Sequence, residues 1–210
     1  MTGGSELVNS INREGAVGRP VGDKRERLVE AAVERFHRQG YARTSLADVA
    51  RAAGLSPGHV FYHFRAKEDL ARAVIDAWCA RLAGSLAALE VGTDGWERLG
   101  RLVDRMTEQR SAYVGLGCPL AGLVRDLRRE SDTLRAELPR VYALQDAWIR
   151  AQFTDLGFTP EATAEHARFL MTTYHGTILL AYAQDDEGLI AGGVATLHAW
   201  LHRLRSEWPG

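Results

Sequence analysis

The sequence predicts an all-α protein in which a small three-helix domain precedes a larger helical domain, with about nine helices in all. Apolar residues recur at three- and four-residue spacing along most of the 210-residue chain, as is typical of amphipathic helices. The stretch from Ser45 to Phe64 holds two short helical patterns on either side of the turn sequence GLSP. No segment shows convincing strand alternation, so we expect no sheet.

Residues 1–22 contain five glycines and one proline without a helical or strand period, and we expect them to form a disordered tail. The first helix is predicted from Asp23, because Asp23 and Glu26 form a D-x-x-E cap and apolar residues follow at helical spacing up to Gly40. Further helices are predicted at 67–90, 94–113, 118–130, 132–156, 160–184 and 187–207.

The second and third helices are predicted from the turn between them. Ser45 with Asp48, or alternatively Thr44, can cap the second helix. Gly54 suits the left-handed position at which a chain reverses after a helix. Ser56 can cap the third helix, whose first position is a proline. Two short helices joined by a glycine-containing turn form a helix-turn-helix motif, which projects its second helix.

The outer face of the third helix is small at its N-terminus and rich in hydrogen-bonding groups beyond it. In a helix-turn-helix, such a face reaches base edges while flanking groups hold phosphates. We therefore expect double-stranded DNA as a partner. The candidate contacts are Arg43, Thr44, Ser45, Ser56, Gly58, His59, Tyr62, His63 and Lys67. The alternative is that the aromatic residues are core residues, which applies most strongly to Phe61 and Phe64.

The charge distribution agrees with an anionic partner for the N-terminal part. Residues 1–75 hold 12 Lys and Arg against 9 Asp and Glu, and the remainder holds 14 against 18. No apolar run approaches the roughly 20 residues of a membrane span, and the N-terminus lacks the order of a signal peptide. We therefore expect a cytoplasmic protein without a membrane partner.

Residues 24–72, above all TSLADVARAAGLSPGHVFYHFRAKEDL, resemble the N-terminal DNA-binding module of the TetR family of bacterial one-component regulators. The resemblance implies an Ω-shaped homodimer with a DNA-binding domain at 23–72 and an effector-binding and dimerisation domain at 73–210. It also implies that Lys67 contacts phosphate and that His59 occupies a variable base-reading position. The expected protein is a repressor that binds a palindromic operator and is released by a small-molecule effector.

The second half of the chain offers candidate effector contacts, because amphipathic and aromatic residues lie on helices that could surround a cavity. They are Tyr113, Cys118, Trp148, Met171, Tyr174 and His175. The alternative is that these residues are ordinary core, since aromatics at helical spacing usually are. For the dimer, apolar stripes on the last two helices predict a two-fold four-helix interface that includes Leu197 and Leu201.

Cys118 precedes Pro119, and this place at a helix start favours the reactive thiolate. The segment GCPLAGLVRDLRRES resembles one branch of the TetR family, whose members include sensors of electrophiles and of small unsaturated acids. Three roles of Cys118 are therefore open: it reacts with an electrophilic effector, it lines the site of a noncovalent effector, or it is an inert buried thiol. Cys79, the other cysteine, is expected in the core.

Two other classes of protein remain as alternatives. Cys118, His175 and Asp126 could be written as a nucleophilic enzyme site, but no flanking signature accompanies them, so we expect no enzyme. The two cysteines have no metal-like spacing, and we expect no cofactor or metal. A helical interaction module that binds no DNA is the second alternative.

Overall fold

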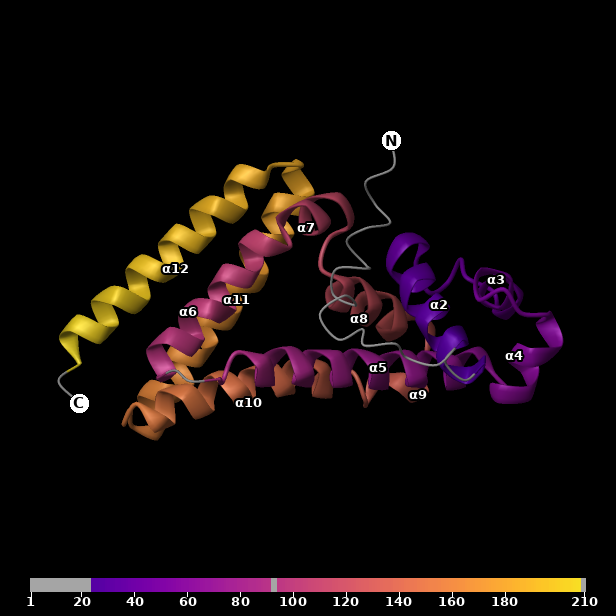
Figure 1. Ribbon diagram of the computed structural model, residues 1–210, viewed down its shortest axis with the longest axis horizontal. Coiled ribbons are helices and arrows are strands. Elements are labelled where there is room, and N and C mark those ends of the chain that lie inside the picture. Colours follow the sequence, from indigo (N-terminus) through magenta and orange to yellow (C-terminus); the bar gives the residue numbers. More distant parts are fainter. Residues whose placement is uncertain (1–23, 92–93, 209–210) are drawn as a thin grey trace. The chain divides into compact units, whose positions relative to one another are not determined.

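The computed structural model describes residues 24–91 and 94–208, which are helical throughout apart from turns and short connections (Figure 1). Eleven helices, α2 to α12, lie in these residues, and no strand does. The all-α prediction is thus confirmed. The tail predicted at 1–22 and the cap predicted at Asp23 lie outside the described residues.

The chain divides into two compact units. The head unit joins the described part of Met1–Trp78 to Pro119–Leu138, and the core unit joins Cys79–Cys118 to the described part of Pro139–Gly210. From the sequence, we expect residues 73–210 to form the second domain. Contacts instead group Pro119–Leu138 with the N-terminal helices, because polar side chains of this segment bind backbone and side-chain groups of the head.

The head unit is built around the helix-turn-helix. Its helices are α2 (Lys24–Gln39), α3 (Leu46–Ala52), α4 (Pro57–His63), the first part of α5 (Lys67–Ala88), α8 (Pro119–Glu130) and α9 (Asp132–Arg135). Each of α2, α3, α4 and α5 buries at least one apolar residue completely, including Leu28, Val49, Val60 and Leu70. These side chains hold α3 and α4 against the flanking helices, which leaves the opposite face of α4 uncovered.

The core unit is a bundle of long helices. It contains the rest of α5 with α6 (Gly95–Glu108), α7 (Arg110–Leu116), α10 (Pro139–Asp155), α11 (Pro160–Gln184) and α12 (Glu187–Glu207). α11 packs against α10, α7 and α12, and α12 also packs against α6. Across the described residues, no helix is long and apolar enough to cross a bilayer, and no cluster of side chains could hold a metal ion.

Two predicted helices are each divided in the structure, which accounts for the difference between about nine and eleven. The segment predicted as one helix at 94–113 forms two. α6 ends at Glu108 and α7 begins at Arg110, because Gln109 between them leaves helical geometry with φ −107° and ψ 10°. The pattern at 132–156 is interrupted before Pro139, because proline starts a helix more readily than it continues one.

Leu197 and Leu201, which were predicted to lie in the dimer interface, are buried within a single chain, so their assignment to that interface is wrong. An interface between the last two helices of two chains stays a prediction. Leu197 and Leu201 belong to the same buried cluster as Ile178 on α11. The two helices approach closely, since a Cβ added at Gly193 would lie 2.4 Å from Cγ2 of Thr177. Helical periodicity shows that a face is covered, and here the cover is the chain's own α6, α7 and α10.

Candidate nucleic-acid interface and ligand site

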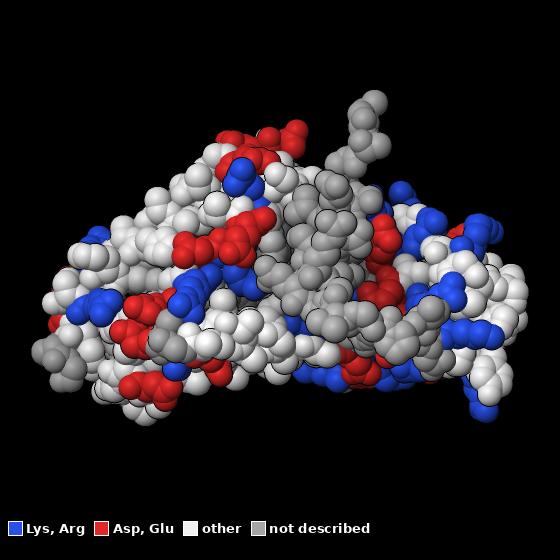
Figure 2. Space-filling model, viewed as in Figure 1, with Lys and Arg blue, Asp and Glu red and all other residues white. Residues whose placement is uncertain are grey.

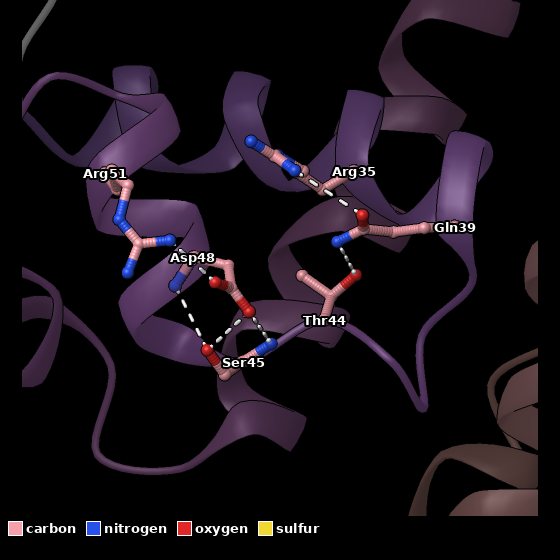
Figure 3. Close-up of polar contacts among 6 residues, drawn as sticks. All are labelled: Arg35, Gln39, Thr44, Ser45, Asp48 and Arg51. Atoms are coloured by element: carbon pink, nitrogen blue, oxygen red, sulfur yellow. Dashed lines mark hydrogen bonds and ion pairs between the residues drawn. The ribbon is translucent and has the colours of Figure 1, made fainter.

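The first turn of α3 is closed by a reciprocal capping box (Figure 3). The Ser45 hydroxyl accepts a hydrogen bond from the Asp48 N–H at 3.1 Å, and the Asp48 carboxylate accepts one from the Ser45 N–H at 3.0 Å. Arg51 also donates to Asp48 at 3.0 Å. The bonds from Ser45, with a smaller effect of Arg51, lower the pKa of Asp48. Of the two predicted caps, Ser45 with Asp48 is therefore confirmed.

Thr44, the other candidate, faces inward with only 1% of its surface exposed. Its hydroxyl donates to the Gly40 carbonyl at 2.8 Å and accepts from the Gln39 amide at 3.2 Å. Arg35 in turn donates to Gln39, so that a chain of polar contacts runs from α2 to the start of α3 (Figure 3). The side chain of Thr44 thus fixes the loop before α3.

The turn between α3 and α4 has the geometry that the sequence predicts. Gly54 has φ +64°, in the left-handed region, and the Leu55 N–H donates to the Ala50 carbonyl at 2.9 Å. Arg27 reaches from α2 to donate to the Ala53 carbonyl at 2.6 Å. The end of α3 is thereby satisfied both by its own turn and by α2, which fixes the direction of α4.

The exposed face of α4 carries aromatic side chains. Tyr62 is 83% exposed and Phe61 is 57% exposed, whereas Val60 and Phe64 are buried. The interpretation of Phe61 as a core residue is therefore wrong, and that of Phe64 is confirmed. Gly58 is exposed and His63 is half-buried, next to Tyr62 with ring centroids 5.0 Å apart.

His59 is held from both sides of its ring. The Lys24 ammonium lies 2.9 Å from Nε2, and the Ser56 hydroxyl lies 2.8 Å from Nδ1. Since an ammonium can only donate, Nε2 accepts and Nδ1 carries the hydrogen that Ser56 receives. A contact between His59 and a base edge therefore requires Lys24 to turn away. Lys24 lies 35 positions before His59, and nothing in the sequence indicated this pairing.

Basic side chains surround α4. Lys67, at the start of α5, donates to the Ala42 carbonyl at 3.3 Å and lies 4.1 Å from the centre of the Tyr41 ring. Partial burial lowers the pKa of Lys67. On the face shown in Figure 2, Lys and Arg side chains lie around the α3 and α4 region. Arg43 and Arg65 are exposed near the two ends of this region.

α8 braces the loop that leads into the helix-turn-helix. The Tyr41 N–H donates to the Asp126 carboxylate at 3.1 Å, and Arg125 pairs with the same carboxylate at 3.1 Å. Gly40 has φ +84°, and a Cβ there would lie 2.7 Å from Oδ2 of Asp126. Asp126 thus uses its carboxylate within the head unit, on the Tyr41 N–H and on Arg125.

In the core unit, a polar cluster joins α7, α10 and α11. The Tyr113 hydroxyl donates to that of Tyr174, and burial is the main reason that the pKa of both is raised, to about 12 for Tyr174. His175 lies 3.1 Å from the Gln145 amide oxygen, and its ring meets Tyr142 edge-on at 5.1 Å.

The remaining candidate ligand residues lie beside this cluster. Cys118 follows α7 and contributes to the raised pKa of Tyr142, after the larger effect of burial. Trp148 and Met171 are half-buried against the same core, and the Trp148 indole donates to Glu90 at 2.8 Å. Tyr142 and Gln145 were missed by sequence reasoning, although both share a face of α10 with Trp148 at three-residue spacing.

The fold and the exposed face of α4 define a helix-turn-helix protein with a separate helical unit. Residues 28–74 match the family model described as bacterial regulatory proteins, tetR family. The transcriptional regulator TtgR of Pseudomonas putida is 40% identical over 55 residues, which are 26% of each chain. The match therefore spans about a quarter of that relative.

Two further comparisons extend beyond the helix-turn-helix. The transcriptional regulator LmrA of Bacillus subtilis is 25% identical over 163 residues, 76% of this chain and 87% of LmrA. The crystal structure of E. coli NemR in its reduced form aligns with a TM-score of 0.75 at 18% identity, over 84% of this chain and 95% of that one. Residues 28–74 are thus similar to the tetR family, and the fold of the described residues is similar to that of the solved structure.

Proposed function

We propose that the protein is a transcription repressor that binds a palindromic operator as a homodimer and releases it when a small molecule binds. The observation that carries this proposal is the exposure of Tyr62 on a short helix whose opposite face is buried by Val60 and Phe64. An aromatic and polar face held on a rigid helix-turn-helix suits a DNA groove. Relatives named transcriptional regulators support the same function. A protein with this function would work in the cytoplasm, where the DNA is.

The proposed DNA contacts have three roles. Gly58, His59, Tyr62 and His63 on α4 face the groove, where Gly58 allows close approach of the backbone. Arg43 and Lys67 hold phosphates, and the positive end of α5 assists Lys67. Ser45 and Ser56 lie at the exposed starts of α3 and α4, where each can also meet the DNA backbone. Thr44 acts by fixing the loop, since its side chain is buried.

The proposed dimer uses the outward faces of α11 and α12. Leu179 is 63% exposed and Leu180 is half exposed, although leucines are usually covered. The outward residues of α12 include Gly192, Ala195 and Ala199, which allow another helix to approach closely. A two-fold interface on these faces would place two heads on one operator, as a palindromic site requires.

The proposed effector site is the polar cluster of α7, α10 and α11, with Tyr113, Cys118, Trp148, Met171, Tyr174 and His175 as contacts. The proposed signal from this site to the DNA first passes along the peptide chain. Cys118 is bonded to Pro119, the first residue of α8, and α8 holds the Tyr41 N–H through Asp126. A ligand that shifts Cys118 would therefore move a helix that braces the DNA-binding loop.

Cys118 can serve the effector site in two ways. A thiolate at the start of α8 could form a covalent bond with an electrophile, or the thiol could line a site for a noncovalent ligand. Cys118→Ser separates them, because a hydroxyl reacts poorly with electrophiles. If electrophiles release the Ser variant from DNA at the same concentrations as the native protein, covalent sensing is wrong.

The test of DNA binding is a mobility shift with promoter fragments from beside the protein's own gene. Tyr62→Ala and His59→Ala should each weaken binding by about 1–3 kcal/mol. Lys67→Ala should weaken all sequences alike and lower the slope of log affinity against log salt by about one. Val91→Ala, at an exposed apolar residue after α5, lies outside the proposed DNA and dimer contacts; it is the control and should leave affinity unchanged.

The alternative is a helical interaction module without DNA binding. It would be favoured if no neighbouring promoter fragment shifts at low salt. Equal salt slopes for the native protein and Lys67→Ala would reject the proposed phosphate contact of Lys67, but not DNA binding itself.

A further inference from the structure

A buried histidine nitrogen of the core unit has no hydrogen-bond partner within the described part of the chain. Nδ1 of His175 is inaccessible to solvent and makes no hydrogen bond there. Buried polar atoms are almost always paired, and each exception calls for an explanation such as a bound molecule. His175 lies on α11 within the polar cluster, so the unpaired atom is in the proposed effector site.

The hydrogen bond on the other side of the ring decides what Nδ1 can do. Nε2 lies 3.1 Å from the Gln145 amide oxygen, which only accepts, so Nε2 carries the ring hydrogen. Nδ1 therefore has a lone pair and needs a donor. Burial lowers the pKa of His175 to about 4, so the imidazole stays neutral near pH 7. Gln145 is itself buried, which fixes the ring orientation.

Aromatic rings frame this acceptor. Tyr142 meets the His175 ring at 5.1 Å and 87°, and Tyr174 meets it at 5.3 Å and 66°. Both phenols are protonated near pH 7, since the ordinary pKa of tyrosine is about 10 and burial raises the pKa of each further. Arg105 and Glu108 act on Tyr174 with opposite signs and smaller effects than burial. The two phenols that pack against the His175 ring are thus uncharged.

We infer that the effector is an uncharged molecule with a flat apolar body and one O–H or N–H group, which donates to Nδ1 of His175. This inference rests on the proposed function, because it names the chemical class that the proposed effector site takes. An anion is disfavoured, since a carboxylate cannot donate to Nδ1 and the charge of Arg105 that acts on Tyr174 is opposed by that of Glu108. Tyr142 and Tyr174 supply the edges against which a flat body packs.

The competing explanation is that one buried water donates a hydrogen bond to Nδ1. Such a water needs two to four polar partners, and it would give the site no preference among aromatic ligands. A matched pair of probes distinguishes the two explanations. Phenol and anisole share the benzene ring, but only phenol has a hydrogen to donate, and benzoate provides the corresponding anion.

The experiment measures dissociation constants of phenol, anisole and benzoate for the full-length protein by NMR titration or calorimetry. Phenol should bind roughly tenfold more tightly than anisole, as one buried hydrogen bond would give. Benzoate should bind more weakly than phenol. His175→Phe removes the acceptor and should make phenol and anisole equal. His166→Phe, a histidine of the same helix packed on Phe153 instead, should keep the native preference.

The native protein alone can overturn the inference, even if His175→Phe fails to fold. Equal binding of phenol and anisole, tighter binding of benzoate, or no binding of any probe would each do so. A preference for phenol that persists in a folded His175→Phe variant would also overturn it. Mobility shifts without any probe report separately on DNA binding. A chain that binds phenol as expected but no DNA would contradict the proposed function, and the converse would contradict only the inference.

Discussion

The two units hold their functional side chains by different means. In the head unit, most partners lie close in sequence: Ser45 binds Asp48 and Ser56 binds His59, each three residues on. In the core unit, Gln145 and His175 are 30 residues apart and come from different helices. The head exposes its polar face to solvent, whereas the core buries its cluster. A local arrangement can be read from a motif, but a buried cluster depends on how several helices pack.

The largest expected effect comes from comparing two charge substitutions in the core unit, one at a buried leucine and one at a leucine proposed to contact the partner chain. Leu197→Asp places a charge among fully buried residues and should lower the free energy of unfolding by roughly 4 kcal/mol or more. Leu179→Asp lies at an exposed position and should leave unfolding within about 0.5 kcal/mol per chain while producing monomers. Urea unfolding and sedimentation measure the two effects.

If Leu197→Asp folds normally and is monomeric, Leu197 lies in the dimer interface, as the sequence predicted. A Leu179→Asp variant that remains dimeric would instead remove α11 from the interface.

Acid should weaken the core unit through His175. The folded pKa, about 4, lies below the ordinary value of 6.5, so the folded state favours the neutral ring. The contribution of His175 is fully present above pH 6.5 and is lost as the pH falls from 6.5 towards 4, by roughly 3 kcal/mol at most. His175→Gln should flatten this part of a stability profile measured by chemical unfolding.

His202→Gln, on the exposed surface of α12, is the control and should retain the native pH profile. A native profile that is flat between pH 7 and pH 4 would contradict the burial of a neutral His175.

A pair of glycines tests the brace between α8 and the head. Gly40 and Gly157 both have positive φ, +84° and +87°, so alanine is strained at each. A Cβ at Gly40 also meets the Asp126 carboxylate, whereas a Cβ at Gly157 would have no other side chain or backbone segment within 4 Å. Gly40→Ala should therefore cost about 1–3 kcal/mol more than Gly157→Ala in urea unfolding. Equal costs would show that the Asp126 carboxylate yields without loss.

The smallest effect concerns the two serines that begin α3 and α4. Ser45 makes a capping box, while Ser56 makes no cap hydrogen bond and instead binds His59. Ser45→Ala should lower the free energy of unfolding by about 1 kcal/mol. Ser56→Ala should leave stability nearly unchanged but weaken DNA binding, because the His59 ring loses its fixed orientation. If both variants lose equal stability, Ser56 is a structural cap after all.

The sequence by itself determined the helices and the helix-turn-helix. The Ser45 cap, the left-handed Gly54 and the proline at the start of α4 act within a few residues, so their chemistry does not depend on the rest of the fold. The exposure of Tyr62 followed from the same motif. These features could be predicted because their causes are local.

Only the tertiary structure decided what covers each helix face. Thr44 proved buried and Phe61 exposed, and the apolar stripes of α11 and α12 were used within one chain. The bond from Asp126 to Tyr41 spans 85 residues, and the unpaired Nδ1 of His175 exists because three helices meet around it. Helical periodicity reports that a face is covered, but the partner and the orphaned atoms are set by packing between segments distant in sequence.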